Sequence, residues 1–155
     1  MGRTIRKMLA TDIPDGVWIT EANWPNCERV KRSILLELSD MFSNAVYRPT
    51  YFVVEEDEKI VGFAGWNWGW HNYDIYELFW CNVLESHRRR GIGHDLVEAR
   101  LADIREVAAS EIGSRKSYVT LSTHLDKHYE RHGFRTIATM NLWQNPQTHL
   151  MIREI

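Results

Sequence analysis

Apolar residues recur at helical spacing in two long segments of the chain, which predicts two amphipathic helices. In residues 27–43 they are Val30, Ile34, Leu35, Leu38 and Phe42. In residues 91–110 they are Ile92, Leu96, Val97, Leu101, Ile104 and Val107, with charged residues on the opposite face. A shorter helix is predicted to begin at Asp12 or Asp15 and to end before residues 23–26. Another lies within residues 125–134, and Gly133 is predicted to end it.

Runs of apolar and β-branched residues predict the strands. Tyr51–Val54 and the run that begins at Ile60 flank a charged turn, which is typical of a hairpin. Residues 74–83 are almost continuously apolar apart from Glu77 and Asn82, and they predict a central strand covered on both faces. The other predicted strands are residues 3–8, 117–123, 135–143 and 148–155, the last two joined by a turn at 145–147.

The predicted order of elements is β-α-α-β-β-β-α-β-α-β-β. It indicates an α/β (α+β) protein in which helices cover a mixed sheet, and it lacks the regular alternation of a doubly wound domain. The chain has 155 residues and no Gly-, Ser- or Pro-rich linker. We therefore expect a single domain over residues 1–155.

The composition excludes several classes of protein. With 44% hydrophobic and 26% charged residues, the chain is typical of soluble globular proteins. Lys and Arg number 19 against 21 Asp and Glu, so the net charge of −2 argues against a nucleic-acid binder. No apolar run is long enough to cross a membrane, and the N-terminus has no signal-peptide pattern. Cys27 and Cys81 have no paired spacing, so we expect a reducing, cytoplasmic location with Cys81 buried in its apolar strand.

The segment "ESHRRRGIGHDL" at residues 85–96 combines three arginines with two glycines between a predicted strand and a predicted helix. The first N–H groups of a helix lack intrahelical partners, and glycine lets a phosphate approach the main chain closely. The segment therefore suits a diphosphate. A glycine-containing turn beside a solvated run of charges is the alternative.

Two segments together carry a family resemblance. "VLESHRRRGIGHDLV" resembles the pyrophosphate-binding segment of the GNAT superfamily of N-acetyltransferases, with Arg88, Gly91 and Gly93 in the motif and Val83 at the usual strand position. "HYERHGF" at residues 128–134 resembles a second family segment, with Tyr129 at its tyrosine. The sequence departs from the family at Ser122, where an asparagine is frequent, and at Glu85, where a proline is usual.

The resemblance implies a GNAT-like, mostly antiparallel central sheet with helices on both faces. It also implies transfer of an acetyl group from acetyl-CoA, as co-substrate, directly to a primary amine. Main-chain groups of Cys81, Asn82 and Val83 would pair with the pantetheine arm of the donor, and a backbone N–H there could polarise the thioester carbonyl. The remaining residues expected to bind the donor are Arg88, Arg89, Arg90, Gly91, Ile92, Gly93, His94 and Ser122.

Glu77 is the candidate general base, because it is the only carboxylate within the apolar part of its strand and lies eleven residues before Arg88, a spacing found in relatives. Its apolar sequence neighbours predict a desolvated carboxylate. There are two alternatives: a water chain could remove the proton in place of the Glu77 side chain, or Glu77 could have a purely structural role. Tyr129 is the candidate acid for the departing thiolate, and a core tyrosine that anchors the short helix is the alternative.

Tryptophans 66, 68 and 70 alternate, so they are predicted to share one face of a strand. These tryptophans could form an aromatic wall that receives a cationic amine by cation–π contact. A bulky sheet face packed on helices is the alternative. The residues expected to bind the acceptor are Trp68, Trp70, Tyr73 and Asp74. His124, His128 and His132 recur every four residues, but their row is too extended for one tetrahedral ion, so we expect a solvated helix face and no metal.

The expected partner is a small-molecule amine or an amine of a protein or peptide, with no nucleic acid and no membrane. Relatives commonly form dimers, so a homodimer is a further expectation. A non-catalytic acyl-CoA-binding module or sensor is the alternative function, because it would keep the phosphate loop without needing Glu77 or Tyr129. DNA binding by Arg88–Arg90 is a second alternative, which the net charge disfavours.

Overall fold

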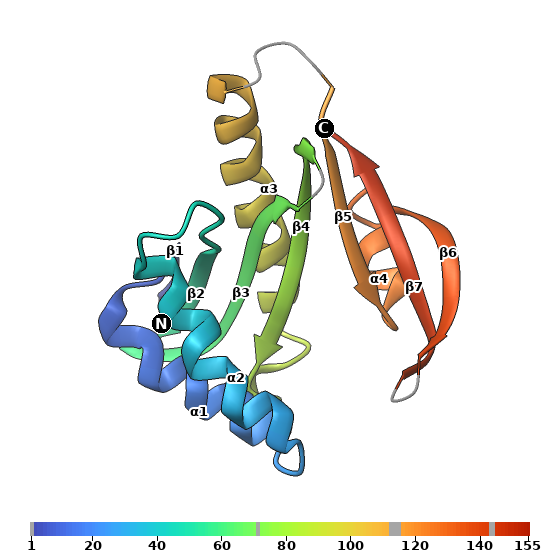
Figure 1. The fold of residues 1–155 in the computed structure, drawn as a ribbon. Helices are drawn as coiled ribbons and strands as arrows, with labels where there is room; N and C mark the ends of the chain where they lie inside the picture. The colour runs from blue at the N-terminus through green and yellow to red at the C-terminus, as the bar shows by residue number, and fades with distance from the viewer. Residues whose placement is uncertain (1, 71, 112–115, 143–144) are drawn as a thin grey trace. The chain divides into compact units, whose positions relative to one another are not determined.

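The computed structural model describes residues 2–70, 72–111, 116–142 and 145–155 (Figure 1). Its strands are β1 (Arg3–Lys7), β2 (Thr50–Glu56), β3 (Lys59–Gly69), β4 (Asn72–Val83), β5 (Tyr118–Thr123), β6 (Arg135–Leu142) and β7 (Asn145–Glu154). Its α-helices are α1 (Ile13–Asn23), α2 (Glu28–Ser39), α3 (Ile92–Glu111) and α4 (Asp126–Glu130). This succession confirms the predicted order of elements. None of the described helices is long and apolar enough to cross a membrane.

The strands form one mixed sheet in the order β1-β2-β3-β4-β5-β7-β6. β4 and β5 pair in parallel through Ile75–Glu77 and Tyr118–Thr120. The pairs β1–β2, β2–β3, β5–β7 and β6–β7 are antiparallel. The predicted α+β class with a mostly antiparallel sheet is thus confirmed.

The chain divides into two compact units. The first comprises Met1–Asn67 and Trp80–Arg100, and the second comprises Trp68–Phe79 and Leu101–Ile155. Strands β3 and β4 and helix α3 each contribute residues to both units.

In the first unit, helices pack on both faces of the β2–β3 hairpin. Asp57 and Glu58 form its two-residue turn with φ of 50° and 62°, the left-handed conformation that matches the twist of the strands. A Cβ on Gly62 would lie 3.4 Å from Ile92 of α3, whereas a Cβ on Gly16 of α1 would lie 3.9 Å from the next strand residue, Phe63. Because successive strand residues point to opposite faces, α3 covers one face and α1 the other.

Strand β4 is covered on one face only, so the prediction of a strand buried on both faces is wrong. Tyr76, Leu78 and Asn82 are buried, whereas Glu77 and Cys81 on the alternate positions are exposed. The expected burial of Cys81 is therefore also wrong. The burial of successive side chains alternates, as in a strand with one covered face, although the residues on both faces are mostly apolar.

Helix α2 and the last hairpin differ from their predicted bounds. α2 ends at Ser39, and a 3-10 turn follows at Asp40–Phe42. Leu35, within the helix, and Phe42, in the turn, are both exposed, although their spacing predicted a buried face. The turn predicted at residues 145–147 is wrong, because β7 begins at Asn145. Residue 143, the end of the preceding predicted strand, lies outside the described residues.

In the second unit, α4 is anchored by Tyr129, whose ring is buried and meets Phe134 edge-on at 5.9 Å between centroids. The helix ends at Glu130, so His124 precedes it and His132 follows it in a turn. His132 is buried, and His128 packs edge-on against it at 5.3 Å. The predicted row of solvated histidines on one helix face is therefore wrong.

Candidate functional site

The loop between β4 and α3 has the backbone of an anion-binding turn. Gly91 has a φ of 84°, a left-handed conformation that other residues adopt at a cost, and Arg89 has a φ of 63°. α3 then begins at Ile92, and the first hydrogen bond along its axis runs from the Asp95 N–H to the Gly91 carbonyl at 3.0 Å. The N–H groups of Ile92 and Gly93 precede that bond, so the positive end of the helix faces the loop.

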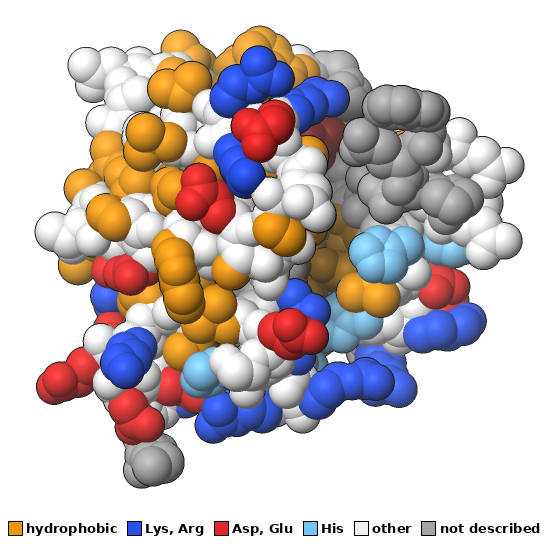
Figure 2. Space-filling view, turned by 90° about the horizontal axis from the view of Figure 1, so that it is seen from below, with side chains coloured by type: hydrophobic (Ala, Val, Ile, Leu, Met, Phe, Trp, Pro, Cys, Tyr) orange, Lys and Arg blue, Asp and Glu red, His pale blue; other side chains and the backbone are white. Residues whose placement is uncertain are grey.

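The three arginines of the loop have different surroundings. Arg88 donates from Nε to the Val83 carbonyl at 3.1 Å and from Nη2 to Asn23 Oδ1 at 2.7 Å, so it ties the end of β4 to the end of α1. Arg90 pairs with Glu56 of β2 at 3.2 Å, and Arg89 is exposed. On the face seen in Figure 2, Lys and Arg side chains are interspersed with Asp and Glu. The arginine run thus contributes individual contacts more than a broad basic surface.

A cluster of four charged residues lies behind the loop, and we call Arg3, Glu56, Arg90 and Asp95 the loop cluster. Arg3 donates from Nε to Glu56 at 2.8 Å, from Nη1 to Asp95 at 2.7 Å and from Nη2 to the Arg90 carbonyl at 2.8 Å. The hydrogen bond from Arg3 holds the pKa of Glu56 below its usual range, and the bonds to Asp95 and Glu56 raise the pKa of Arg3. Sequence reasoning missed this cluster, since no local pattern links residue 3 to residues 56, 90 and 95.

The end of β4 is held by α1. Asn82 is buried, and its amide donates to Thr20 Oγ1 at 3.3 Å. Asn23 donates to the Asn82 side-chain oxygen at 3.4 Å and to the Val83 carbonyl at 3.3 Å. The Asn82 side chain is thus occupied by structural contacts, whereas the Cys81 side chain is exposed.

Trp80 is a strained residue that sequence reasoning did not single out. Its φ of 41° is rare for a non-glycine residue inside a strand. Its indole N–H donates to Glu37 of α2 at 2.5 Å, and its ring meets Trp24 edge-on at 5.6 Å. Contacts from α2 and from Trp24, the residue that follows α1, therefore hold the strand at this kink.

Glu77, in the second unit, stands at the last paired position of the β4–β5 ladder, opposite Thr120. Its side chain is exposed, so the desolvation expected from its apolar neighbours is absent. The cause is the alternation of the strand, which turns Tyr76 and Leu78 to the buried face while Glu77 points the other way. The Thr120 hydroxyl donates to the Tyr76 carbonyl at 3.2 Å.

The aromatic residues expected to bind the acceptor differ in exposure. Trp68 is half-buried, with its ring 6.4 Å from that of Tyr76, whereas Trp70 and Tyr73 are 77% and 61% exposed. Trp66, in the first unit, is buried, and Trp70 lies beyond the end of β3. The predicted common face of alternating tryptophans therefore does not extend to Trp70.

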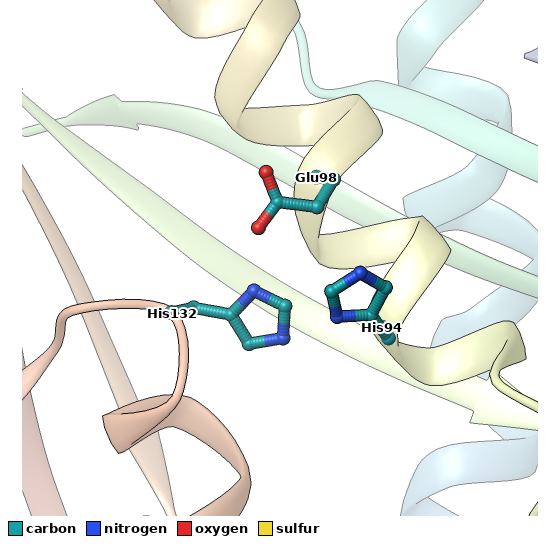
Figure 3. Close-up of side chains that lie close together, drawn as sticks. All are labelled: His94, Glu98 and His132. Carbon is teal, nitrogen blue, oxygen red and sulfur yellow. The ribbon is translucent and has the colours of Figure 1, made fainter.

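The remaining predicted residues lie at element ends. Asp74 is half-buried, and its N–H donates to Asn72 Oδ1 at 2.7 Å. Ser122 is exposed near the end of β5. His94 is exposed in the first turn of α3, and Figure 3 shows its imidazole on the same side of that helix as Glu98, one turn further along.

The model of the acetyltransferase (GNAT) domain family matches residues 48–136, more than half of the chain. The chain belongs to the GNAT acetyltransferase family. As a GNAT enzyme it is an acyl-CoA-dependent acetyltransferase with acetyl-CoA as co-substrate, which confirms the resemblance read from the two motifs. The backbone of the Arg88–His94 loop fits the diphosphate of such a donor, because a left-handed glycine precedes a helix start there.

Solved structures confirm the GNAT fold. The aminoglycoside 6′-N-acetyltransferase complexed with coenzyme A is 14% identical, with a TM-score of 0.76 and coverage of 97% of this chain and 96% of that one. The PaiA N-acetyltransferase from Thermoplasma acidophilum in complex with coenzyme A is 15% identical, with a TM-score of 0.73 and both chains fully covered. The ribosomal-protein-S18-alanine N-acetyltransferase from Escherichia coli is 18% identical, with a TM-score of 0.72 and coverage of 99% and 94%. No curated protein matches this chain in sequence.

Proposed function

We propose that this GNAT acetyltransferase moves the acetyl group of acetyl-CoA directly to a primary amine, with Glu77 as general base and Tyr129 as general acid. The observation that carries the donor half of this proposal is the loop in which Gly91, at a φ of 84°, leads into the first turn of α3. We further propose that residues 1–155 act as one catalytic domain.

The donor would be held through the main chain. The Asn82 side chain already contacts Thr20 and Asn23, so Asn82 would contribute its backbone, together with Cys81 and Val83, to the pantetheine arm. A backbone N–H of this segment could polarise the thioester carbonyl. The diphosphate would accept hydrogen bonds from N–H groups of the Arg88–His94 loop.

The chemical step requires three proton transfers. Glu77 takes a proton from the ammonium form of the acceptor, and the freed amine attacks the thioester carbonyl carbon, after which the nitrogen of the tetrahedral intermediate releases its second proton to solvent. As the carbon–sulfur bond breaks, the Tyr129 hydroxyl gives its proton to the departing thiolate and later regains one from solvent. Exposure of the Glu77 carboxylate supports contact with an incoming ammonium, and the buried, ring-packed Tyr129 has a defined position.

The acceptor would be a cation that bears a primary amine. Exposed Trp70 and Tyr73 offer aromatic faces to an ammonium, and the carboxylates of Asp74 and Glu77 offer negative charge in the same segment. Two structural neighbours are named for amine acceptors, an aminoglycoside and the alanine of ribosomal protein S18. These features support both small-molecule and protein amines. Cytoplasmic location and a homodimer stay predictions.

An acceptor screen tests the proposal. Purified protein is incubated with acetyl-CoA and one amine from each class: an aminoglycoside, a polyamine, an amino acid, a lysine peptide and a peptide with N-terminal alanine. We expect free thiol to be released faster with one class than without amine. Thermal melting is measured in parallel, because acetyl-CoA at one hundred times its Kd should add about 2.7 kcal/mol of stability.

Three measurements separate the alternatives: thiol release, thermal melting and binding to random DNA. Stabilisation by acetyl-CoA without amine-dependent thiol release would favour the non-catalytic acyl-CoA-binding module. No stabilisation at all would contradict the donor assignment itself. Salt-sensitive binding to random DNA that CoA does not disturb would instead support nucleic-acid binding by the arginine run.

A further inference from the structure

Arg3 connects the first strand of the protein to the loop that would hold the donor. Its three donor groups reach three different elements: Glu56 on β2, the carbonyl of Arg90 in the loop, and Asp95 in the first turn of α3. Glu56 stands directly opposite Arg3 in the β1–β2 ladder, so the paired strands fix the base of this arrangement. The Arg3 side chain as a whole is about a quarter exposed.

The bond from Arg3 to the Arg90 carbonyl fixes the orientation of the next amide. A trans peptide is planar, and its carbonyl and N–H point in opposite directions. Because the Arg90 carbonyl faces Arg3, the Gly91 N–H faces away from the loop cluster. Arg3 Nη1 also lies 3.6 Å from the position that a Cβ would take on Gly91, so the guanidinium lies directly beside this residue.

The loop cluster could attract the negative charge of the diphosphate, or it could orient the backbone that binds the diphosphate. The charges within the cluster favour the second role. Arg3 and Arg90 carry two positive charges, and Glu56 and Asp95 carry two negative charges at contact distance. The cluster therefore supplies little net field to an anion. Its directed hydrogen bonds instead hold the peptide before Gly91 and the first turn of α3 in one arrangement.

We propose that Arg3 is a positioning residue for the acyl donor: by holding the Arg90 carbonyl and Asp95, it presents the Gly91 N–H and the start of α3 to the diphosphate. This inference rests on the proposed binding of the acetyl-CoA diphosphate by the loop. Arg3 would touch neither the donor nor the acceptor. Its effect would therefore be confined to donors that carry a diphosphate.

Arg6 provides a matched control on the same strand. It also binds two carboxylates, Asp12 at 2.6 Å and Glu55 at 3.1 Å, but three residues along the strand it points to the opposite face from Arg3. Its described hydrogen bonds go to Asp12, Glu55 and the Lys7 carbonyl, which all lie outside the loop. Removing Arg6 thus removes a comparable ion-pair cluster from β1.

The experiment compares Arg3→Gln with Arg6→Gln on two donors, acetyl-CoA and S-acetylpantetheine, which lacks the diphosphate. For Arg3→Gln we expect the KM for acetyl-CoA to rise about tenfold, the equivalent of losing one hydrogen bond from the loop to the charged diphosphate. The kcat should stay within about twofold of wild type. Its kcat/KM for S-acetylpantetheine should equal that of wild type. Arg6→Gln should lower the Tm without changing either donor parameter.

Arg3→Lys separates orientation from charge and carries the test if Arg3→Gln does not fold. A lysine keeps the charge, but its single ammonium cannot reach all three partners, so we expect most of the loss in acetyl-CoA affinity to remain. Wild-type affinity in Arg3→Lys, equal losses on both donors, or an equal loss in Arg6→Gln would each overturn the positioning role. Failure of the wild-type protein to bind acetyl-CoA would instead contradict the proposed function.

Discussion

Two regions of the protein carry the proposed chemistry, and they are built differently. The donor region, Cys81–Val83 with Arg88–His94, is held by specific contacts from α1, β1 and β2. The acceptor region, Trp68, Trp70, Tyr73, Asp74 and Glu77, presents mostly exposed side chains. A preorganised site suits a ligand that never varies, because its binding groups lose their conformational entropy when the protein folds and not when the ligand binds. Exposed aromatic and acidic groups can instead suit several amines. The difference predicts that changes in each region affect different parameters.

The largest expected effect is in the acceptor region, from Glu77→Gln. Loss of a general base removes about 10²- to 10⁴-fold of rate, so kcat with the best amine should fall by at least about one hundredfold. The Kd for acetyl-CoA, measured by calorimetry, should not change, because the donor region is intact. The exposed position of Glu77 makes a folding defect from this isosteric change unexpected.

Asp74→Asn is the matched carboxylate control, with an expected change in kcat well below that of Glu77→Gln. The opposite ranking would move the base to Asp74. Equal and small effects of both changes would favour base action through a water chain, and a weakened acetyl-CoA complex in Glu77→Gln would show that the two regions are not independent.

An intermediate effect is expected in the donor region from Gly91→Ala, with Gly133→Ala as its control. Both glycines have a left-handed backbone, with φ of 84° and 77°, so each alanine should destabilise the fold by about 1 kcal/mol. Only Gly91→Ala should also weaken acetyl-CoA binding, by several-fold. Thermal melting with and without acetyl-CoA measures both quantities in one titration.

For both glycine positions the Cβ itself has room, since its first neighbour would be an arginine side-chain atom at 3.6 Å. Backbone strain is therefore the common cost, and the loop geometry is the difference between the two variants. A shared loss of acetyl-CoA affinity would mean that strain anywhere in the fold impairs the donor complex, and the contrast between the regions would fail.

Sequence reasoning predicted elements and local motifs well. The β2–β3 hairpin, helix α3 and the strand–loop–helix around Gly91 follow from periodicity and glycine placement within short windows. The apolar run predicted strand β4 but not which of its faces is covered, because residues on both faces of the strand are apolar and no two-residue alternation shows in the sequence. That is why Glu77 was expected in an apolar setting and Cys81 in the core, although both are exposed.

Contacts between distant segments could not be predicted. Arg3 and Arg90 are 87 residues apart, and Asn23 reaches Val83 across 60 residues. Arg100 shows the same limit within a helix: it is fully buried, and its guanidinium donates to the Gly65 carbonyl at 3.1 Å, 35 residues away in the sequence. A single sequence carries no signal for such pairings, since any carboxylate or carbonyl could serve as the partner.

The smallest expected effect is that of Trp70→Ala in the acceptor region. With 77% of its surface exposed, Trp70 should leave the free energy of unfolding within about 0.5 kcal/mol of wild type when removed. An exposed cation–π contact is worth about 0.5–1 kcal/mol, so the KM for the amine should rise about two- to fivefold while the KM for acetyl-CoA stays constant. Trp70→Phe keeps a ring and should recover part of the loss, whereas equal KM values for all three proteins would remove Trp70 from the acceptor region. A change in the KM for acetyl-CoA alone would assign Trp70 to donor binding and would contradict the separation of the donor and acceptor regions.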